Sequence, residues 1–144
     1  MNSYIFKINL LRRPKIIREI EISGNVSLYK LAEAIVSAYN FDLDHCFGFF
    51  NEVDEWGYLD SEKKYELFTD LIEEGEDIEP TGAGSVKKTK IKEVWQDIGE
   101  RMLFLFDYGD NWQFVVELKD FGKKETKKKY PRVLRRIGRS PRQY

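Results

Sequence analysis

The chain has 144 residues, of which 42% are hydrophobic and 15% aromatic, and a formal net charge of −1; this composition favours one folded domain over residues 1–144 and excludes a disordered protein. One cysteine, Cys46, and one histidine, His45, exclude an intrachain disulfide and a Cys/His zinc cage, and we expect neither a metal nor a cofactor. No secretion signal follows Met1 and no apolar run approaches the ~20 residues of a membrane span, which indicates a cytoplasmic protein without membrane contact.

Two alternating segments near the N-terminus predict a pair of β-strands. In residues 4–11, every second side chain from Tyr4 to Leu10 is apolar, and residues 16–22 alternate in the same way. Pro14 marks the turn between them, because proline fixes φ and has no amide hydrogen to donate. The two segments are expected to form an antiparallel hairpin.

An amphipathic helix is predicted next. Ser27 is a suitable N-cap, and apolar side chains from Leu28 to Tyr39 recur at spacings of three and four. The helix over residues 28–39 is therefore expected to cover one face of the sheet. After it, the aromatic run at residues 45–50 predicts a buried strand.

The middle of the chain predicts two further helices. A shorter amphipathic pattern begins after Asp60 and ends at Gly75. Residues 76–85 contain one proline and two glycines and predict a loop. Residues 91–98 then carry apolar side chains at helical spacing and predict one or two turns that end at Gly99.

Residues 104–118 predict a β-hairpin that is central in the sheet, because both of its faces are largely apolar. A two-residue loop would pair Asp107 with Trp112 and place a charge on the main apolar face, so the pattern favours a three-residue loop at residues 109–111. Asn111 is expected to take the left-handed conformation there. This register places seven apolar side chains on one face: Phe104, Phe106, Tyr108, Trp112, Phe114, Val116 and Leu118.

The last segment predicts one more strand. Residues 123–129 are a charged loop, and residues 130–138 are suited to an edge strand, where Pro131 and several arginines are tolerated. Together the elements predict an α+β fold, with an antiparallel or mixed sheet of about five strands and two or three helices packed against it.

The central hairpin carries a recognisable motif, made of Phe106, Asp107, Tyr108, Gly109, Asp110, Trp112, Tyr130 and Pro131. Its arrangement as an aromatic strand, a Gly-Asp-x-Trp turn, a second strand and a Tyr-Pro pair resembles the plasmid pRiA open-reading-frame-three-like family. Asp44-His45, followed by Phe47 and Phe49, is similar to an upstream strand of that family.

The resemblance implies a passenger protein of plasmids and insertion elements that has no established activity, although relatives sometimes carry a resolvase-like name. A serine recombinase needs a nucleophilic serine among positioned arginines, and no serine of this sequence stands in such a constellation. Phe47 and Phe114 occupy positions where many relatives have histidine. A histidine site found elsewhere in the family is therefore not expected here.

Three residues are candidates for a metal-dependent enzymatic site. His45 can exchange a proton near neutral pH, and the carboxylates of Asp107 and Asp110 can bind a divalent cation or share a proton. The structural interpretation is favoured, because Asp and Asn stabilise turns through local hydrogen bonds, Trp112 suits a core position, and no nucleophile stands beside His45. Calcium-loop and nucleotide-binding motifs are absent from the sequence.

Charge is distributed very unevenly. Residues 41–80 carry fourteen acidic side chains and two lysines, whereas residues 119–144 carry eleven basic side chains and two acidic ones. The basic region predicts a non-catalytic module that binds nucleic acid or an acidic protein surface through Lys123, Lys124, Lys127, Lys128, Lys129, Arg132, Arg135, Arg136 and Arg139. Two alternatives remain open: a solvated charged surface without a partner, or self-assembly in which the acidic and basic regions meet within one chain or between copies.

Overall fold

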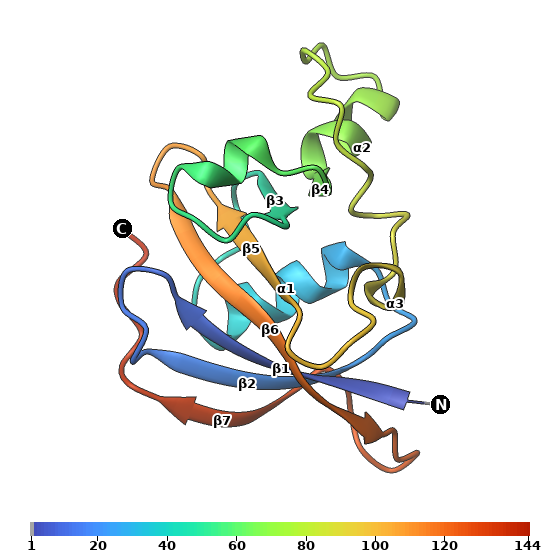
Figure 1. The fold of residues 1–144 in the computed structure, drawn as a ribbon, viewed down its shortest axis with the longest axis vertical. Helices are drawn as coiled ribbons and strands as arrows, with labels where there is room; N and C mark the ends of the chain where they lie inside the picture. The colour runs from blue at the N-terminus through green and yellow to red at the C-terminus, as the bar shows by residue number, and fades with distance from the viewer. Residues whose placement is uncertain (1) are drawn as a thin grey trace.

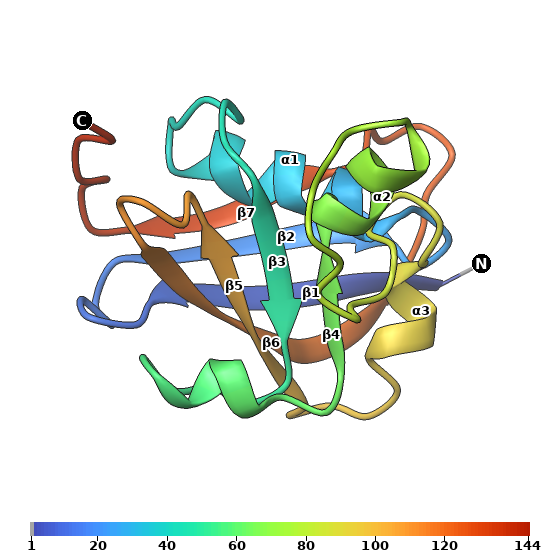
Figure 2. The same cartoon turned by 90° about the horizontal axis from the view of Figure 1, so that it is seen from above.

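A computed structural model describes residues 2–144, which form one antiparallel sheet with helices on its faces (Figure 1). The strands are β1 (Asn2–Leu10), β2 (Ile17–Ser23), β3 (Phe47–Phe50), β4 (Lys64–Glu66), β5 (Arg101–Phe106), β6 (Trp112–Lys123) and β7 (Arg132–Ile137). The helices are α1 (Leu28–Ala38), α2 (Leu67–Glu73) and α3 (Ile91–Val94), with a 3₁₀ turn at Gly57–Asp60. Within the described residues the sheet has seven strands in the order β4-β3-β5-β6-β1-β2-β7 (Figure 2).

The α+β class and the antiparallel sheet are confirmed, but the expected number of about five strands was too low. The predicted N-terminal hairpin is the β1–β2 pair, in which Phe6 lies opposite Ile20. The predicted helix is α1, and the Ser27 hydroxyl accepts a hydrogen bond from the backbone N–H of Lys30 at 3.2 Å, as an N-cap does. Figure 1 shows α1 lying across one face of the sheet.

The core on the α1 face of the sheet is built largely from aromatic rings. Phe104 of β5 is fully buried, with ring centroids 5.7 Å from Phe47, 4.8 Å from Phe49 and 5.7 Å from Phe114. A second, smaller apolar cluster covers the opposite face of the same strands, around Phe50, Leu103 and Leu105. The two clusters explain why both faces of the central hairpin are apolar in sequence.

The turn of that hairpin differs from the expected three-residue loop. Phe106 pairs with Trp112, so the turn contains the five residues 107–111. The two registers differ by two residues, and a side-chain pattern with a period of two cannot distinguish them. Asn111 is left-handed as predicted (φ 58°), but Asp107 is left-handed too (φ 65°), and Tyr108 packs against the smaller cluster on the opposite face from Phe106.

The predicted helix after Asp60 is also corrected, because β4 interrupts it. Residues 64–66 pair with β3, and the backbone N–H of Glu66 donates to the carbonyl of Gly84 at 3.0 Å. These hydrogen bonds to distant backbone outweigh the local helical pattern, so that only α2 is helical. The last predicted helix is shortened to the four residues of α3. Of the helices in residues 2–144, none is long and apolar enough to cross a membrane.

We expect Phe104→Ala to lower the free energy of unfolding by about 3–5 kcal/mol, because it removes a fully buried ring from a close-packed aromatic cluster. Leu134→Ala is the control, since Leu134 is exposed on β7, and its effect should stay within about 0.5 kcal/mol. Urea unfolding followed by circular dichroism measures both. Equal losses for the two variants would contradict this arrangement of the core.

Candidate functional site

The sheet order places the two charged regions at opposite edges. Strand β4 and its neighbour β3 belong to the acidic region 41–80, whereas β7 belongs to the basic region and pairs with β2 at the other end of the sheet. We use the name "basic edge" for the predicted binding residues on and around β7: Lys123, Lys124, Lys127, Lys128, Lys129, Arg132, Arg135, Arg136 and Arg139.

Strand β7 is fixed to β2 by ion pairs with two buried glutamates. The Arg132 guanidinium donates to Glu21 Oε1 from Nε at 2.9 Å and from Nη2 at 2.6 Å, and this hydrogen bonding raises the pKa of Arg132. Glu19 accepts from Lys119 Nζ at 2.9 Å and lies 3.7 Å from Arg135 Nη1. The carboxylates that neutralise these cations come from β2 and not from the acidic region 41–80.

Arg18 of β2 connects the end of β7 to the rest of the molecule, although it is not among the site residues predicted from sequence. Its side chain is buried and donates to the carbonyls of Ala38 (3.0 Å) and Ile137 (3.1 Å) and to the Ser140 hydroxyl (2.7 Å). The guanidinium also lies 4.8 Å from the centre of the Tyr39 ring, and burial lowers the pKa of Arg18. The alternating pattern of β2 could have predicted the burial of Arg18, because a period of two puts this residue on the inward face of the strand with Ile20 and Ile22.

Most cations of the basic edge face solvent. Within residues 2–144, six of the nine form no ion pair with a carboxylate: Lys123, Lys124, Lys127, Lys129, Arg136 and Arg139. Lys128 is paired with Glu125. The ring of Tyr130 lies among these cations, 5.8 Å from Lys124 Nζ and 5.5 Å from the Arg132 guanidinium carbon.

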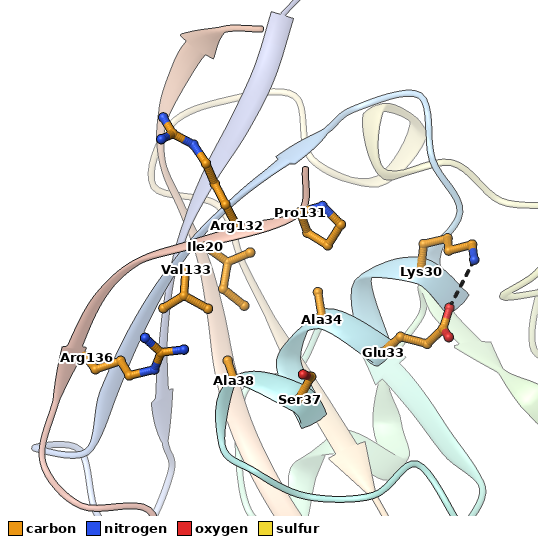
Figure 3. Close-up of a pocket in the computed structure, with 10 residues that line it drawn as sticks. All are labelled: Ile20, Lys30, Glu33, Ala34, Ser37, Ala38, Pro131, Arg132, Val133 and Arg136. Carbon is orange, nitrogen blue, oxygen red and sulfur yellow. Dashed lines mark ion pairs between the residues drawn. The ribbon is translucent and has the colours of Figure 1, made fainter. Parts of the chain in front are cut away.

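A groove of about 430 Å³ runs between α1 and β7 beside the basic edge (Figure 3). Its lining is apolar at Ile20, Ala34, Ala38, Pro131 and Val133, and polar or charged at Lys30, Glu33, Ser37, Arg132 and Arg136. Figure 3 shows Lys30 and Arg136 at opposite ends of the groove, while Arg132 is directed away from it. The groove thus combines an apolar floor with a cation at each end.

The three candidates for an enzymatic site come together only in part. His45 Nδ1 lies 2.7 Å from Asp44 Oδ1 and 3.5 Å from Asp107 Oδ2, and the Tyr144 hydroxyl is 3.3 Å from the same nitrogen. The carboxylate of Asp110 is hydrogen-bonded to neither His45 nor Asp107 among the described residues. It lines a separate cavity of about 220 Å³ next to the β1–β2 turn.

The geometry around Asp107 shows a structural use for this carboxylate. Its Oδ1 accepts hydrogen bonds from the backbone N–H of Gly109 at 3.1 Å and of Asp110 at 3.2 Å, so it holds the five-residue turn. His45 is about 40% exposed beside it. In the described part of the chain, no three His, Cys, Asp or Glu side chains are grouped so that they could hold a metal ion.

The remaining motif residues contact neighbouring elements. The Tyr108 hydroxyl donates to Glu66 of β4, and burial raises the pKa of Tyr108. Trp112 packs edge-on against Phe41, with ring centroids 4.9 Å apart. The Tyr130 hydroxyl accepts a hydrogen bond from the backbone N–H of Glu125 at 3.1 Å, and the Tyr130–Pro131 peptide bond is cis.

The fold and the motif define an α+β domain with a charged sheet edge, and comparison with known proteins gives its family. The sequence profile described as plasmid pRiA4b ORF-3-like protein matches residues 2–143, so the chain belongs to that family, as the hairpin motif predicted. A crystal structure of a protein of unknown function from Methanosarcina mazei Go1 is 24% identical, with a TM-score of 0.73 over 94% of this chain and 69% of that one, and shows the same fold. No curated protein matches the chain.

We expect His45 to titrate above its ordinary pKa of about 6.5, because its hydrogen bond to Asp44 and the charge of Asp107 favour the imidazolium. The Asp44–His45 pair then stabilises the fold below pH ~6.5, and this contribution is lost as the pH rises through the raised pKa. NMR titration is unambiguous, since the chain has one histidine. Asp44→Asn should lower the midpoint, whereas Asp77→Asn should not; a wild-type midpoint at or below 6.5 would refute this.

Proposed function

We propose that this protein is a non-catalytic nucleic-acid-binding module that contacts backbone phosphates through its basic edge. The observation that carries the proposal is a series of six exposed cations without carboxylate partners in residues 2–144, which extends from the end of β6 through the following loop to β7 and just beyond it. When such cations neutralise phosphates, the counterions condensed on the nucleic acid are released, and this release supplies most of the affinity of non-specific binding.

The arrangement of the edge favours an extended polyanion. Arg135 and Arg136 are exposed on β7, and the lysines at positions 127–129 are exposed in the loop that precedes this strand. The acidic region, which lies at the opposite sheet edge, would repel phosphates and so orient the module with β7 toward the nucleic acid. Tyr130 offers an aromatic ring among the cations, which can stack on a base of a single strand.

The enzyme hypothesis has weaker support. His45 and Asp107 are close together, but Asp107 holds the turn and Asp110 faces a different cavity. A general base needs a nucleophile or substrate within hydrogen-bonding reach, and in residues 2–144 no serine, threonine or cysteine side chain is hydrogen-bonded to His45. We therefore propose a binding function, in the cytoplasm and in association with plasmids or other mobile elements.

Binding to labelled duplex and single-stranded DNA, measured by fluorescence anisotropy from ~50 to ~300 mM salt, tests the proposal. We expect log Kobs to fall linearly with log salt, and we expect Lys127→Glu/Lys129→Glu to weaken binding and to reduce that slope by roughly 2. The matched control is Lys63→Glu/Arg101→Glu, which makes the same charge change at exposed positions beside β4 and on β5, away from the basic edge. For this control variant, the slope of log Kobs against log salt should be nearly that of the unmodified chain.

Three results would overturn the proposal. The first is no binding at ~50 mM salt, or binding that does not depend on salt. The second is equal weakening by the two double variants, because overall charge would then explain the affinity. The third is displacement by an acidic polypeptide. If polyglutamate displaces DNA at the same charge concentration, the basic edge is a site for acidic proteins and the nucleic-acid proposal fails.

A further inference from the structure

We propose that the groove between α1 and β7 receives the acidic loop of a second copy of this chain, residues 76–80 after α2. This contact goes beyond nucleic-acid binding and does not rest on it. The inference is drawn from two complementary surfaces of the same molecule, one apolar and cationic, the other exposed and acidic.

The receiving surface is the α1–β7 groove. Its floor includes Pro131, which is exposed, and Val133, which is half-buried, so apolar surface remains uncovered in the single chain. Arg136 stands at one end without an ion pair in residues 2–144, and Lys30 stands at the other end with only a 3.4 Å pairing to Glu33 one helical turn along. An occupant that fits this lining carries an apolar side chain with carboxylates on either side.

The loop at residues 76–80 has this chemistry. Its order is Glu-Asp-Ile-Glu-Pro, so that Ile78 lies between two carboxylates. The acidic side chains are exposed, and in the described chain none of Glu76, Asp77 and Glu79 forms an ion pair, whereas the preceding Glu73 and Glu74 are paired with lysines. Figure 1 shows the segment after α2 projecting from the body of the molecule.

The groove cannot be filled by the loop of its own chain. The loop follows α2 on the β4 side of the sheet, and the groove lies over β7 at the other end. Six inter-strand spacings of about 4.8 Å give a path of roughly 29 Å along the sheet between these edges, and Figure 1 shows the segment after α2 and β7 at opposite ends of the molecule. The donor must be another copy, and because loop and groove are different surfaces the contact is heterologous, which gives head-to-tail dimers, rings or longer chains.

Docking in the groove places Ile78 over Val133 and Pro131, and brings the carboxylates of Asp77 and Glu79 toward Lys30 and Arg136. Arg136 also belongs to the basic edge. A docked loop and a bound nucleic acid therefore compete for this cation, so that nucleic acid is expected to disperse the assemblies.

Light scattering without nucleic acid tests the contact. At ~20 mM salt we expect a mean mass above that of one copy that rises with protein concentration and falls to one copy at ~0.5 M salt. Asp77→Lys/Glu79→Lys and Lys30→Glu/Arg136→Glu should each be monomeric. An equimolar mixture of these two variants should assemble again, because the reversed loop then meets the reversed groove.

The matched control is Asp60→Lys/Glu62→Lys, which makes the same charge change at exposed acidic positions outside the loop and should assemble like the unmodified chain. A peptide of residues 73–81 provides a measurement that does not depend on the folding of any variant: it should bind the unmodified chain and dissolve the assemblies, and a peptide with Gln and Asn in place of the acids should not. A monomer at ~20 mM salt, assembly that survives loop reversal, or a mixture that stays monomeric would each overturn the proposal.

Discussion

The attachment of β7 to β2 is the interaction on which the charged surfaces depend. Buried Glu19 and Glu21 of β2 require cations, and Lys119, Arg132 and Arg135 supply them. Buried Arg18 completes the attachment by satisfying carbonyls of α1 and β7. Removing one of these partners leaves a buried polar group unpaired, which costs about 1–3 kcal/mol for each neutral group and more for each charged one. The position of the basic edge is thus fixed because two of its cations, Arg132 and Arg135, form ion pairs with buried glutamates of β2.

The strand order places the acidic and the basic regions of the sequence at opposite edges of the sheet. The acidic region 41–80 contains β3 and β4 at one end of the sheet, and the basic region contains β7 at the other. Had β7 added beside β4, the two charges would cancel within the chain. Their separation leaves an exposed cationic surface, which we propose binds nucleic acid, and, in the loop after α2, an exposed acidic segment, which we propose docks in a groove on another copy.

Local sequence patterns predicted the helices and strands that have strong periodicity. They failed for elements whose secondary structure depends on hydrogen bonds to backbone groups far away in the sequence. The hairpin of β1 and β2, the helix α1 with its Ser27 cap, and the family motif around Trp112 could be recognised from sequence. Strand β4 could not, because it exists through hydrogen bonds to β3 and to Gly84. The two-residue error in the β5–β6 turn came from a pattern that repeats every two residues.

The sequence predicted which residues belong to the candidate site but not how they are arranged in space. The cationic residues of the basic edge could be named from sequence, and so could His45 and Asp107. The apolar groove beside Arg136 could not, because it depends on how far α1 lies from β7, and no sequence pattern measures a distance between elements. The five-residue turn, in which Asp110 is not hydrogen-bonded to His45 in residues 2–144, could not be predicted from sequence either.

Amide hydrogen exchange of Arg18→Met tests most directly whether the β2–β7 attachment organises this edge. The attachment predicts that residues 132–137 lose protection by tenfold or more, while β5 and β6 keep the protection that they have in the unmodified chain. Unchanged protection of β7, or a uniform loss across all strands, would show that Arg18 does not hold the edge strand in place and would contradict this role of the β2–β7 attachment.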